Sequence, residues 1–371
     1  MSSKIERPVV LAHHWLVNIR GGEKVLKEFA YLYPNSPVYC LFSNPAITRE
    51  IDHLGEVKPS LLRFVPSASK NFRNFLFLFP FLVSRFAVPK EAKLLLSSDA
   101  NLIKGLRKPP SCKHICYCHS PPRYLWELQK EYLDVSNAGK LRRLILKLVT
   151  PYLRRYDYKA AQKVDLFIAN SKFVAERIRR YYNRESVVVN PPVDVDRFSL
   201  GETKDEYYLI VSELVPYKRV DVAVRSFNEN RKPLVIVGDG PEMPRLVRNA
   251  GKNISFKGRL SDADVNGLFS RAKAFIFPGI EDFGITPLEA QACGTPVLAF
   301  RAGGALETVI EGKTGYFFNE QTLESLSDCV QRFETSPPID PRACRKNASR
   351  YHPENFRSEI AKIINNQMGK N

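Results

Sequence analysis

A pattern of short apolar runs alternating with longer amphipathic stretches passes through the chain twice, with a proline pair between the two passes. Apolar runs of this length, rich in β-branched and aromatic residues, are typical of buried strands. Before the prolines the expected strands are 9–12, 38–42, 93–97, 114–118, 165–169 and 187–189. After them the expected strands are 207–211, 234–237, 254–256, 274–277, 297–300 and 316–318. Strands that alternate with helices predict an α/β protein with mainly parallel sheets, each covered on both faces.

Helical periodicity fills the intervals between the expected strands. The expected helices are 23–32, 140–162, 171–182, 220–228, 242–250, 262–271, 287–292, 323–334 and, at the end, about 355–366. Asn190-Pro191-Pro192 interrupts the pattern, and paired prolines favour an extended connection. We therefore expect a hinge and two Rossmann-like, doubly wound domains, of residues 1–193 and 194–351. Because ligands of such sheets bind at the carboxyl ends of the strands, we expect a cleft where the two domains face each other.

The chain of 371 residues carries 56 Lys and Arg against 39 Asp and Glu, a formal net charge of +17. This excess predicts an anionic partner, for which a nucleotide donor, an anionic lipid surface and nucleic acid are the candidates. Residues 140–184 concentrate the excess, with thirteen basic residues against three acidic ones. Residues 61–90 hold seven phenylalanines and five basic residues but no acidic one, and their apolar centre is too short to cross a bilayer. This segment is either an element that rests on a membrane surface or a buried helix of the first domain.

The seven cysteines are odd in number and irregularly spaced, which is not typical of a disulfide framework. Residues 1–10 lack the apolar stretch of a signal peptide, so we expect a cytoplasmic protein. The cysteines and the histidine of 112–119 fit no common zinc spacing. Two Asp-X-Asp triplets, at 194–196 and 262–264, lie in the hinge and at a helix start, away from the expected cleft. We therefore expect no catalytic metal ion and no other cofactor.

Two motifs offer groups that suit phosphate. Gly21 and Gly22 open an expected helix, where close backbone approach and N–H groups suit phosphate oxygens, although a plain turn uses the same pair. Lys218 and Arg219 follow the first strand of the second domain. A diphosphate leaving group gains negative charge as its bond to a sugar breaks, and fixed cations stabilise that charge. Both motifs are therefore candidates for binding a nucleotide diphosphate.

The stretch 281–297 is the most specific motif of the chain. Glu281 and Glu289 enclose a glycine loop and a helix expected to begin at Pro287, whose missing N–H suits the first helical position. The N–H groups of the loop would face an anion or sugar oxygens, and each carboxylate can hold vicinal hydroxyls, one pair on a hexose and one on a ribose. Because buried carboxylates need such partners, the motif favours a polyhydroxylated ligand.

Together these motifs resemble those of the family-4 retaining glycosyltransferases, which have the two-domain fold called GT-B. The resemblance covers nearly the whole chain and includes the stretches 117–122 and 191–194. The chain is also similar to the bacterial members that build lipid-linked surface polysaccharide, including O-antigen mannosyltransferases. The resemblance implies that the C-terminal helix, about 352–371, folds back onto the first domain, which would bind the acceptor, while the second would bind the nucleotide sugar.

The resemblance also implies a role for each matching residue. His119, Lys218 and Glu281 would be catalytic: the histidine contacts the donor sugar, the lysine faces the diphosphate, and the glutamate holds sugar hydroxyls. The donor-binding residues that it implies are Gly21, Gly22, Arg219, Asp282, Phe283, Gly284, Ile285, Thr286, Leu288 and, on the ribose, Glu289.

The chain departs from the family pattern at one position. Many members carry an arginine five residues before the lysine, where this chain has Glu213, and we expect Arg219 to supply the missing cation. His13 and His14, after the first strand, are weaker candidates for the same cleft.

These observations imply a metal-independent, retaining transfer of a hexose from a nucleotide-diphosphate sugar to a lipid-linked saccharide. The expected donor is GDP-mannose, and the expected context is O-antigen or lipopolysaccharide synthesis at the inner-membrane surface, with 61–90 and 140–184 as the membrane contact. A nucleotide-sugar epimerase on the same fold is the alternative. A nucleic-acid-binding protein is less favoured, because the basic stretches lack a recognisable binding motif, and we expect no nucleic-acid partner.

Overall fold

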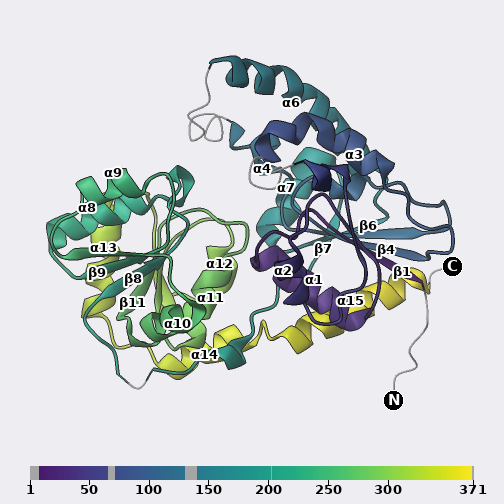
Figure 1. Ribbon diagram of the computed structural model, residues 1–371. Coiled ribbons are helices and arrows are strands. Elements are labelled where there is room, and N and C mark those ends of the chain that lie inside the picture. The colour runs from purple at the N-terminus through teal and green to yellow at the C-terminus, as the bar shows by residue number, and fades with distance from the viewer. Residues whose placement is uncertain (1–7, 66–71, 130–139, 202, 370–371) are drawn as a thin grey trace. The chain divides into compact units, whose positions relative to one another are not determined.

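The computed structural model describes residues 8–65, 72–129, 140–201 and 203–369, and for 72–74 and 140–146 it describes the backbone alone. The described residues fall into two compact units (Figure 1). Unit 1 extends to Pro192 and includes the C-terminal helix from Pro353 onward, and unit 2 is Val193–His352. The chain thus passes from one unit to the other directly after the proline pair.

Unit 1 is built on a seven-stranded parallel sheet in the order β3-β2-β1-β4-β5-β6-β7. Its strands are β1 (Val9–His13), β2 (Val38–Cys40), β3 (Val57–Pro59), β4 (Leu94–Asp99), β5 (Lys113–Cys118), β6 (Leu166–Ala169) and β7 (Ser186–Val188). Six of them overlap the strands expected from the sequence. The seventh, β3, is a three-residue edge strand that contains Lys58 and Pro59, so it has no continuous apolar run.

Both faces of this sheet are buried. Val10 and Ala12 of β1 lie in one hydrophobic core, whereas the alternate residues Val9 and Leu11 lie in another. The helices in the described part of unit 1 are α1 (Gly21–Leu32), α2 (Pro45–Arg49), α3 (Phe79–Arg85), α4 (Arg123–Trp126), α6 (Lys140–Ala161), α7 (Lys172–Tyr182) and α15 (Pro353–Met368). The described residues of unit 1 also form the 3₁₀ helices η1 (Leu61–Phe64), η2 (Phe72–Leu78) and η3 (Ile103–Gly105).

The C-terminal helix α15 packs beside α1 (Figure 1). Phe356 stacks on Phe29 with ring centroids 6.0 Å apart. Arg357 donates a hydrogen bond to the carboxylate of Glu28. The end of the chain therefore completes the core on the face of the sheet that α1 covers.

Unit 2 repeats this architecture with a six-stranded parallel sheet in the order β10-β9-β8-β11-β12-β13. Its strands, all expected from the sequence, are β8 (Tyr208–Val211), β9 (Leu234–Val237), β10 (Ile254–Gly258), β11 (Ala274–Phe277), β12 (Val297–Phe300) and β13 (Gly315–Phe318). Its helices are α8 (Val220–Asn230), α9 (Met243–Arg248), α10 (Asp262–Arg271), α11 (Ile285–Ala292), α12 (Ala305–Thr308), α13 (Leu323–Thr335) and α14 (Pro341–Ser349). Two 3₁₀ helices are η4 (Val195–Arg197) and η5 (Pro216–Lys218). The α/β prediction of two Rossmann-like units is confirmed.

The helix expected to begin at Pro287 begins two residues earlier, at Ile285. Gly284 precedes it with φ of 89°, a left-handed conformation that favours glycine. Pro287 is therefore the third residue of α11. The first four N–H groups of a helix have no partner within it, so a proline is tolerated there as well as at the first position.

The phenylalanine-rich segment is divided between core and surface. Phe79 and Leu82 of α3 are buried in the core of unit 1. Phe64 of η1 and Phe81 of α3 are instead 69% and 52% exposed. The segment thus contains both a buried helix and exposed aromatic side chains, the two features that its alternatives require. The side chains of 66–74 lie outside the described residues.

Two further features bear on the sequence expectations. All seven cysteines are buried and unpaired. None of the helices in the described part of the chain is both long enough and apolar enough to span a bilayer.

In each sheet the winding direction reverses between two neighbouring strands. In unit 1 the chain adds β2 and β3 on one side of β1 and β4 to β7 on the other, so the switch lies between β1 and β4. In unit 2 the equivalent switch lies between β8 and β11. Loops that leave the carboxyl ends of the strands diverge at such a point, and ligands of doubly wound sheets bind there. The topology therefore indicates one ligand-binding position in each unit.

Candidate active site

The switch point of unit 1 brings three histidines together. His13 ends β1, His14 follows it, and His119 directly follows β5. Between these strands lies β4, whose Ser98 is in register with His13. The ring of His119 lies 6.5 Å from that of His13 and 6.2 Å from that of His14, measured between centroids. His119 is thus part of a cluster that includes both of the weaker candidates.

Gly22 packs against this cluster from the first turn of α1. A Cβ atom at Gly22 would lie 3.2 Å from Cε1 of His13, 3.3 Å from Cε1 of His14 and 3.6 Å from Nε2 of His119. The first two distances are tight for a methyl group, so the missing side chain lets α1 begin close to the rings. Gly21 is the first residue of α1, which begins two residues before the expected start at Glu23.

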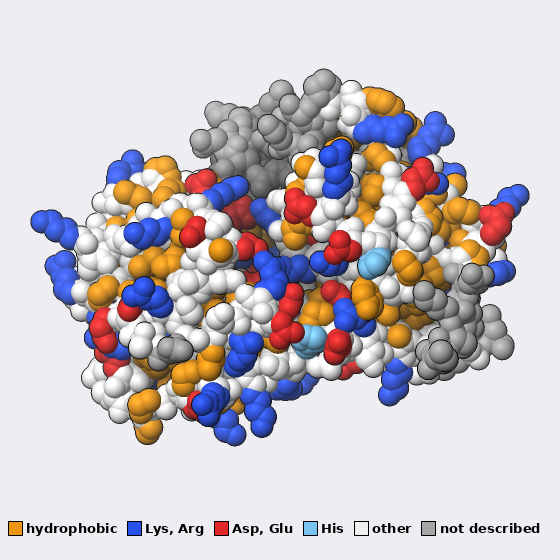
Figure 2. All heavy atoms as spheres, turned by 60° about the horizontal axis from the view of Figure 1, so that its bottom comes forward, with side chains coloured by type: hydrophobic (Ala, Val, Ile, Leu, Met, Phe, Trp, Pro, Cys, Tyr) orange, Lys and Arg blue, Asp and Glu red, His pale blue; other side chains and the backbone are white. Residues whose placement is uncertain are grey.

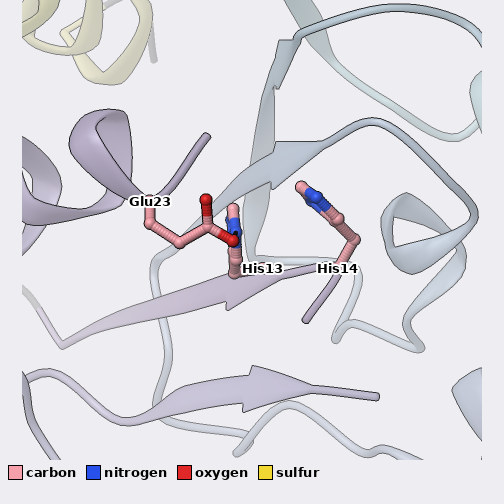
Figure 3. A group of neighbouring side chains, drawn as sticks. All are labelled: His13, His14 and Glu23. Carbon is pink, nitrogen blue, oxygen red and sulfur yellow. Dashed lines mark ion pairs between the residues drawn. The ribbon is translucent and has the colours of Figure 1, made fainter. Parts of the chain in front are cut away.

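The carboxylate of Glu23, the third residue of α1, points at the imidazole of His13 (Figure 3). Its Oε1 lies 3.5 Å from Nε2 of His13, and its Oε2 accepts a 2.9 Å hydrogen bond from the backbone N–H of Arg20. Burial alone would raise the pKa of Glu23, but its contact with His13 and its electrostatic interactions with His13 and His14 lower it to about 2. The buried carboxylate is therefore ionised, with His13 as its partner.

Burial keeps the other two histidines of the cluster neutral. Together with the neighbouring histidines, it lowers the pKa of His119 to about 3 and that of His14 to about 4. A neutral imidazole offers one N–H donor and one lone-pair acceptor. Gly22 therefore lies against the rings of His13, His14 and His119, with the ionised carboxylate of Glu23 beside His13. This environment suits the hydroxyl groups of a sugar better than an anion.

Both backbone groups of His119 are held. Its N–H donates a 2.8 Å hydrogen bond to the carbonyl oxygen of Asp99, and its own carbonyl oxygen accepts one of 2.9 Å from Nδ2 of Asn170. Its side-chain Nε2 lies 2.7 Å from Oγ of Ser98. Asn170 and Ser98 were not expected at the site. The signal that points to Ser98 is a polar end, Ser97-Ser98-Asp99, on an otherwise apolar strand.

The switch point of unit 2 holds Lys218 and Glu281. Lys218 ends η5 after β8, and Glu281 lies in the loop after β11. The Nζ of Lys218 forms an ion pair with Oε1 of Glu281. Gly279 allows this approach, since a Cβ atom there would lie 2.9 Å from Cα of Lys218 and 3.0 Å from its carbonyl oxygen. Two residues expected to bind different parts of one ligand are therefore in contact.

A second glycine pair, not expected at the site, supports the loop of Glu281. The N–H of Gly304 donates a 2.9 Å hydrogen bond to the carbonyl oxygen of Glu281. A Cβ atom at Gly304 would lie 2.1 Å from the carbonyl oxygen of Phe283, and one at Gly303 would lie 2.5 Å from that of Glu281. Gly303 also has φ of 63°. Only glycine fits at these positions, and a Gly-Gly pair soon after β12 is the signal for them.

The remaining expected donor-binding residues lie along this loop and the start of α11. The side chains of Phe283 and Leu288 are buried in the core of unit 2, so only their backbone groups could contact a ligand. The other expected residues of the stretch are half-buried: Asp282, Gly284, Ile285, Thr286 and Glu289.

The guanidinium of Arg219 is bound within unit 2. It donates hydrogen bonds of 3.1 and 3.2 Å to the side-chain and backbone oxygens of Gln321, and one of 3.3 Å to Asp221. Gln321 in turn donates a 2.7 Å hydrogen bond to the carbonyl oxygen of Pro278, beside the loop of Glu281. Glu213, where the family often has arginine, is exposed. Gln321 was not expected, and it ties Arg219 to the loop that follows β13.

Two family models match the chain, one on each half. The model described as Glycosyltransferase Family 4 matches residues 37–197, and the model described as Glycosyl transferases group 1 matches residues 193–351. The chain belongs to glycosyltransferase family 4. The two matches meet where the structure passes from unit 1 to unit 2.

Curated relatives of this family-4 chain include bacterial mannosyltransferases. It is 32% identical over 170 residues to a GDP-mannose-dependent alpha-(1-6)-phosphatidylinositol monomannoside mannosyltransferase of Mycolicibacterium smegmatis, covering 38% of this chain and 44% of that protein. It is 29% identical over 221 residues to a GDP-mannose-dependent monoacylated alpha-(1-6)-phosphatidylinositol monomannoside mannosyltransferase of Corynebacterium glutamicum. That match covers 49% of this chain and 58% of that protein. It is 27% identical over 194 residues to the D-rhamnosyltransferase WbpZ of Pseudomonas aeruginosa, covering 47% and 50%. The chain spans about half the length of these relatives.

Solved structures share the fold over nearly the whole chain. The HepE protein of Anabaena, solved with UDP and glucose, has a TM-score of 0.70 at 16% identity and covers 96% of this chain and 99% of its own. Sucrose-phosphate synthase of Thermosynechococcus elongatus has a TM-score of 0.70 at 15% identity, covering 98% and 100%. The family-4 chain therefore has the GT-B fold that the resemblance implied.

Proposed function

We propose that this family-4 chain is a glycosyltransferase that moves a hexose from a nucleotide-diphosphate sugar with retention of configuration. The observation that carries the proposal is the ion pair between Lys218 and Glu281 at the switch point of unit 2. A cation suited to phosphate and a carboxylate suited to hydroxyls are in contact there. A nucleotide-diphosphate sugar carries both kinds of partner within one molecule, so it can satisfy the two side chains at once.

In this proposal the bond between the anomeric carbon and the diphosphate oxygen breaks, and the acceptor oxygen forms the new bond on the same face of the sugar. The acceptor proton passes to the departing diphosphate oxygen, so no protein carboxylate acts as a nucleophile. Lys218 and Arg219 stabilise the charge that grows on the diphosphate in the transition state. Glu281 orients the hexose hydroxyls and Glu289 binds the ribose, while His119 contacts a sugar hydroxyl.

GDP-mannose is the donor that we propose. Two of the relatives bear names that specify GDP-mannose as their donor, and their acceptors are glycolipids by name. The likeness to HepE, solved with UDP and glucose, lies at 16% identity and supports the fold alone. The acceptor that we propose is a lipid-linked saccharide of O-antigen or lipopolysaccharide synthesis.

An exposed aromatic surface on unit 1 supports a lipid-linked acceptor. Leu61, Phe64 and Phe81 are exposed. Arg63 lies 4.6 Å over the ring of Phe64, and Arg85 lies 5.2 Å over that of Phe81. Apolar rings beside arginines suit the boundary between headgroups and acyl chains. We propose that this surface rests on the cytoplasmic face of the inner membrane.

The positive charge gives less support to nucleic acid as a partner. Within 140–184, Arg177 is paired with Glu127 and Arg179 with Glu185. On the face shown in Figure 2, the Lys and Arg side chains of the described residues are interspersed with acidic ones. A nucleic-acid backbone instead requires an extended row of cations.

A donor screen with product analysis tests the proposed function. The chain is incubated with GDP-mannose, UDP-glucose or UDP-galactose and a membrane extract of lipid-linked saccharides, and the anomeric configuration of the product is read by NMR. Transfer from GDP-mannose with the α configuration kept is the expected result. An inverted product would contradict retention, and a donor isomerised without any acceptor would identify an epimerase instead.

Glu281→Gln is the matched test of the site. It removes the carboxylate at constant size and is expected to lower transfer at least about a hundredfold. Glu311→Gln is its control, because Glu311 is also ion-paired in unit 2, with Arg301, but lies on a different loop. Equal activity of Glu281→Gln and Glu311→Gln would exclude the assigned site.

Vesicle binding tests the membrane surface separately. The double change Phe64→Ser and Phe81→Ser is expected to weaken sedimentation with vesicles that contain anionic lipid by about tenfold or more. Leu306→Ser, at an exposed apolar residue of unit 2, is the control and should bind as the unchanged protein does. Vesicle binding that both variants keep in full would rule out this surface as the contact.

A further inference from the structure

Four side chains of unit 1 form a continuous series of polar contacts that ends at His119, with one ion-pair contact followed by two hydrogen bonds. Oε1 of Glu23 lies 3.5 Å from Nε2 of His13. Nδ1 of His13 lies 3.0 Å from Oγ of Ser98, and the same Oγ lies 2.7 Å from Nε2 of His119. Glu23, His13 and Ser98 are all buried. Water therefore does not compete for these contacts, and each must be made by one donor and one acceptor.

The carboxylate at one end decides the direction of every bond in this chain. An ionised carboxylate only accepts hydrogen bonds, so Nε2 of His13 carries the proton that faces Glu23. Where His13 is neutral, its Nδ1 is then an acceptor, and the Ser98 hydroxyl donates to it. The hydroxyl has a single proton, so its oxygen must accept from His119, whose Nε2 carries a hydrogen. Neutral His119 is left with an unprotonated Nδ1.

We propose that Glu23, His13 and Ser98 are positioning residues that hold His119 in the Nε2–H tautomer, so that its Nδ1 accepts a hydrogen bond from a hydroxyl of the bound sugar. The tautomer itself does not depend on the proposed function, whereas the contact with a sugar hydroxyl rests on it. The ligand class at this place is then a hydroxyl donor, since the lone pair of Nδ1 would repel a phosphate oxygen.

His14 has the same polarity for an independent reason. Its Nδ1 lies 3.4 Å from the backbone carbonyl oxygen of Ser98, which cannot donate. Its Nδ1 therefore carries the proton and its Nε2 is the acceptor. The unprotonated nitrogens are thus Nδ1 of His119 and Nε2 of His14. Gly22 packs against both rings, since its Cβ position lies 3.3 Å from Cε1 of His14 and 3.6 Å from Nε2 of His119.

A bound metal ion would give the opposite result, which makes the proposal testable. The ligand atoms that His13, His14 and Glu23 could offer lie within 4.8 Å of one another. An ion bound to Nε2 of His13 would place the proton on Nδ1, since a metal-ligating histidine donates its other N–H to a neighbouring acceptor. Ser98 would then donate to Nε2 of His119, and His119 would become the Nδ1–H tautomer.

The experiment reads the tautomer of His119 by two-dimensional ¹H–¹⁵N NMR of the full chain labelled with [¹⁵N]histidine. The chain has six histidines, and a His119→Asn sample identifies the signals of His119. At about pH 8, well above the ordinary histidine pKa, the expected pattern is a protonated Nε2 and an unprotonated Nδ1. An Nδ1–H pattern would overturn the proposal, and so would a pattern that becomes Nε2–H only after treatment with EDTA.

Glu23→Gln tests the donor and acceptor order of these contacts without changing the size of the side chain. The amide oxygen of the new side chain can still accept from the backbone N–H of Arg20, so its NH₂ group faces His13 and donates. Every bond then reverses, and His119 is expected to switch to the Nδ1–H tautomer. Glu28→Gln is the control, because Glu28 is a buried and paired acid of the same helix outside the chain of bonds. An unchanged tautomer in Glu23→Gln, or an equal change in Glu28→Gln, would overturn the assignment.

Kinetic measurements test the contact of His119 with a sugar hydroxyl separately from its tautomer. With the tautomer switched, kcat of Glu23→Gln is expected to fall roughly tenfold, the effect of one lost hydrogen bond to a reacting sugar, while Glu28→Gln stays within about twofold. A switched tautomer with unchanged kcat would exclude the contact with the sugar. If the unchanged protein transfers no sugar at all, the proposed function fails while the NMR result still stands.

Discussion

The ammonium group of Lys218 is ion-paired with the carboxylate of Glu281, although the two residues lie 63 positions apart in the chain. They meet because β8 and β11 are neighbours in the sheet of unit 2 and the loop of each strand leaves at the same edge. In the proposed function, the two side chains pair with each other until the nucleotide sugar binds to both of them. The pair therefore keeps the two groups in position at little cost in conformational freedom.

Replacing Lys218 by methionine removes the charge and keeps most of the side-chain volume. Because the lost cation would stabilise the leaving diphosphate, kcat/KM for the nucleotide sugar is expected to fall by about 10²–10³-fold. Lys232→Met is the control, since Lys232 is also ion-paired in unit 2 but its partner is Glu334. Steady-state assays of the two variants check this. A loss of the same size in both would point to a general effect of charge.

Gly22→Ala places a methyl group against His13 and His14. The rings must move by a few tenths of an ångström, which would disturb the alignment of His119, and we expect transfer to fall roughly tenfold. Gly267→Ala is the matched control in α10, where a Cβ atom meets no heavy atom within 4 Å. It is expected to keep full activity and to stabilise the helix by about 1 kcal/mol. Assays combined with urea unfolding check both, and full activity of Gly22→Ala would contradict the packing argument.

The stability of unit 1 is expected to fall in mild acid. Burial, followed by the charge of Lys108, lowers the pKa of His114 to about 3 from an ordinary 6.5, and its Nε2 lies 2.8 Å from Oγ of Ser97. Between these two values the unfolded chain binds a proton that the folded chain does not. The free energy of unfolding therefore has its highest value from this group above about pH 6.5, and it falls as the pH drops below that. His14 and His119, also with lowered pKa values, act in the same direction.

His114→Gln isolates one of these groups. Between about pH 7 and pH 5 the unchanged protein should lose about 2 kcal/mol through His114, and the variant should lose that much less. Urea unfolding followed by tryptophan fluorescence measures it. Both tryptophans, Trp15 and Trp126, lie in unit 1 and report on its unfolding alone. An equal decrease in the free energy of unfolding of the variant between about pH 7 and pH 5 would contradict the burial argument.

Strands were the most predictable part of this fold, and the reason is physical. Each parallel strand is buried on both faces, so it appears in the sequence as a continuous apolar run. The short helices α2, α4 and α12 escaped prediction because four or five residues make little more than one helical turn, too few for apolar residues to recur at helical spacing.

At the site, the residues predicted from the sequence are those within local motifs, such as Gly22 and Glu281. Those that were missed reach the site only through tertiary structure. Ser98 is beside His13 and His119 because β4 lies between β1 and β5, an order that no local pattern reveals. Gln321 reaches Arg219 across 102 positions of the chain.

Isothermal titration of GDP and GDP-mannose against the unchanged protein, Lys218→Met and Glu281→Gln tests most directly whether Lys218 and Glu281 hold two ends of one donor. Lys218→Met is expected to weaken both ligands by a similar factor, roughly tenfold or more. Glu281→Gln is expected to bind GDP at least as tightly as the unchanged protein and to lose the additional affinity for the sugar. If instead Glu281→Gln weakened GDP and GDP-mannose equally, or Lys218→Met weakened neither, the two residues would not share a nucleotide sugar.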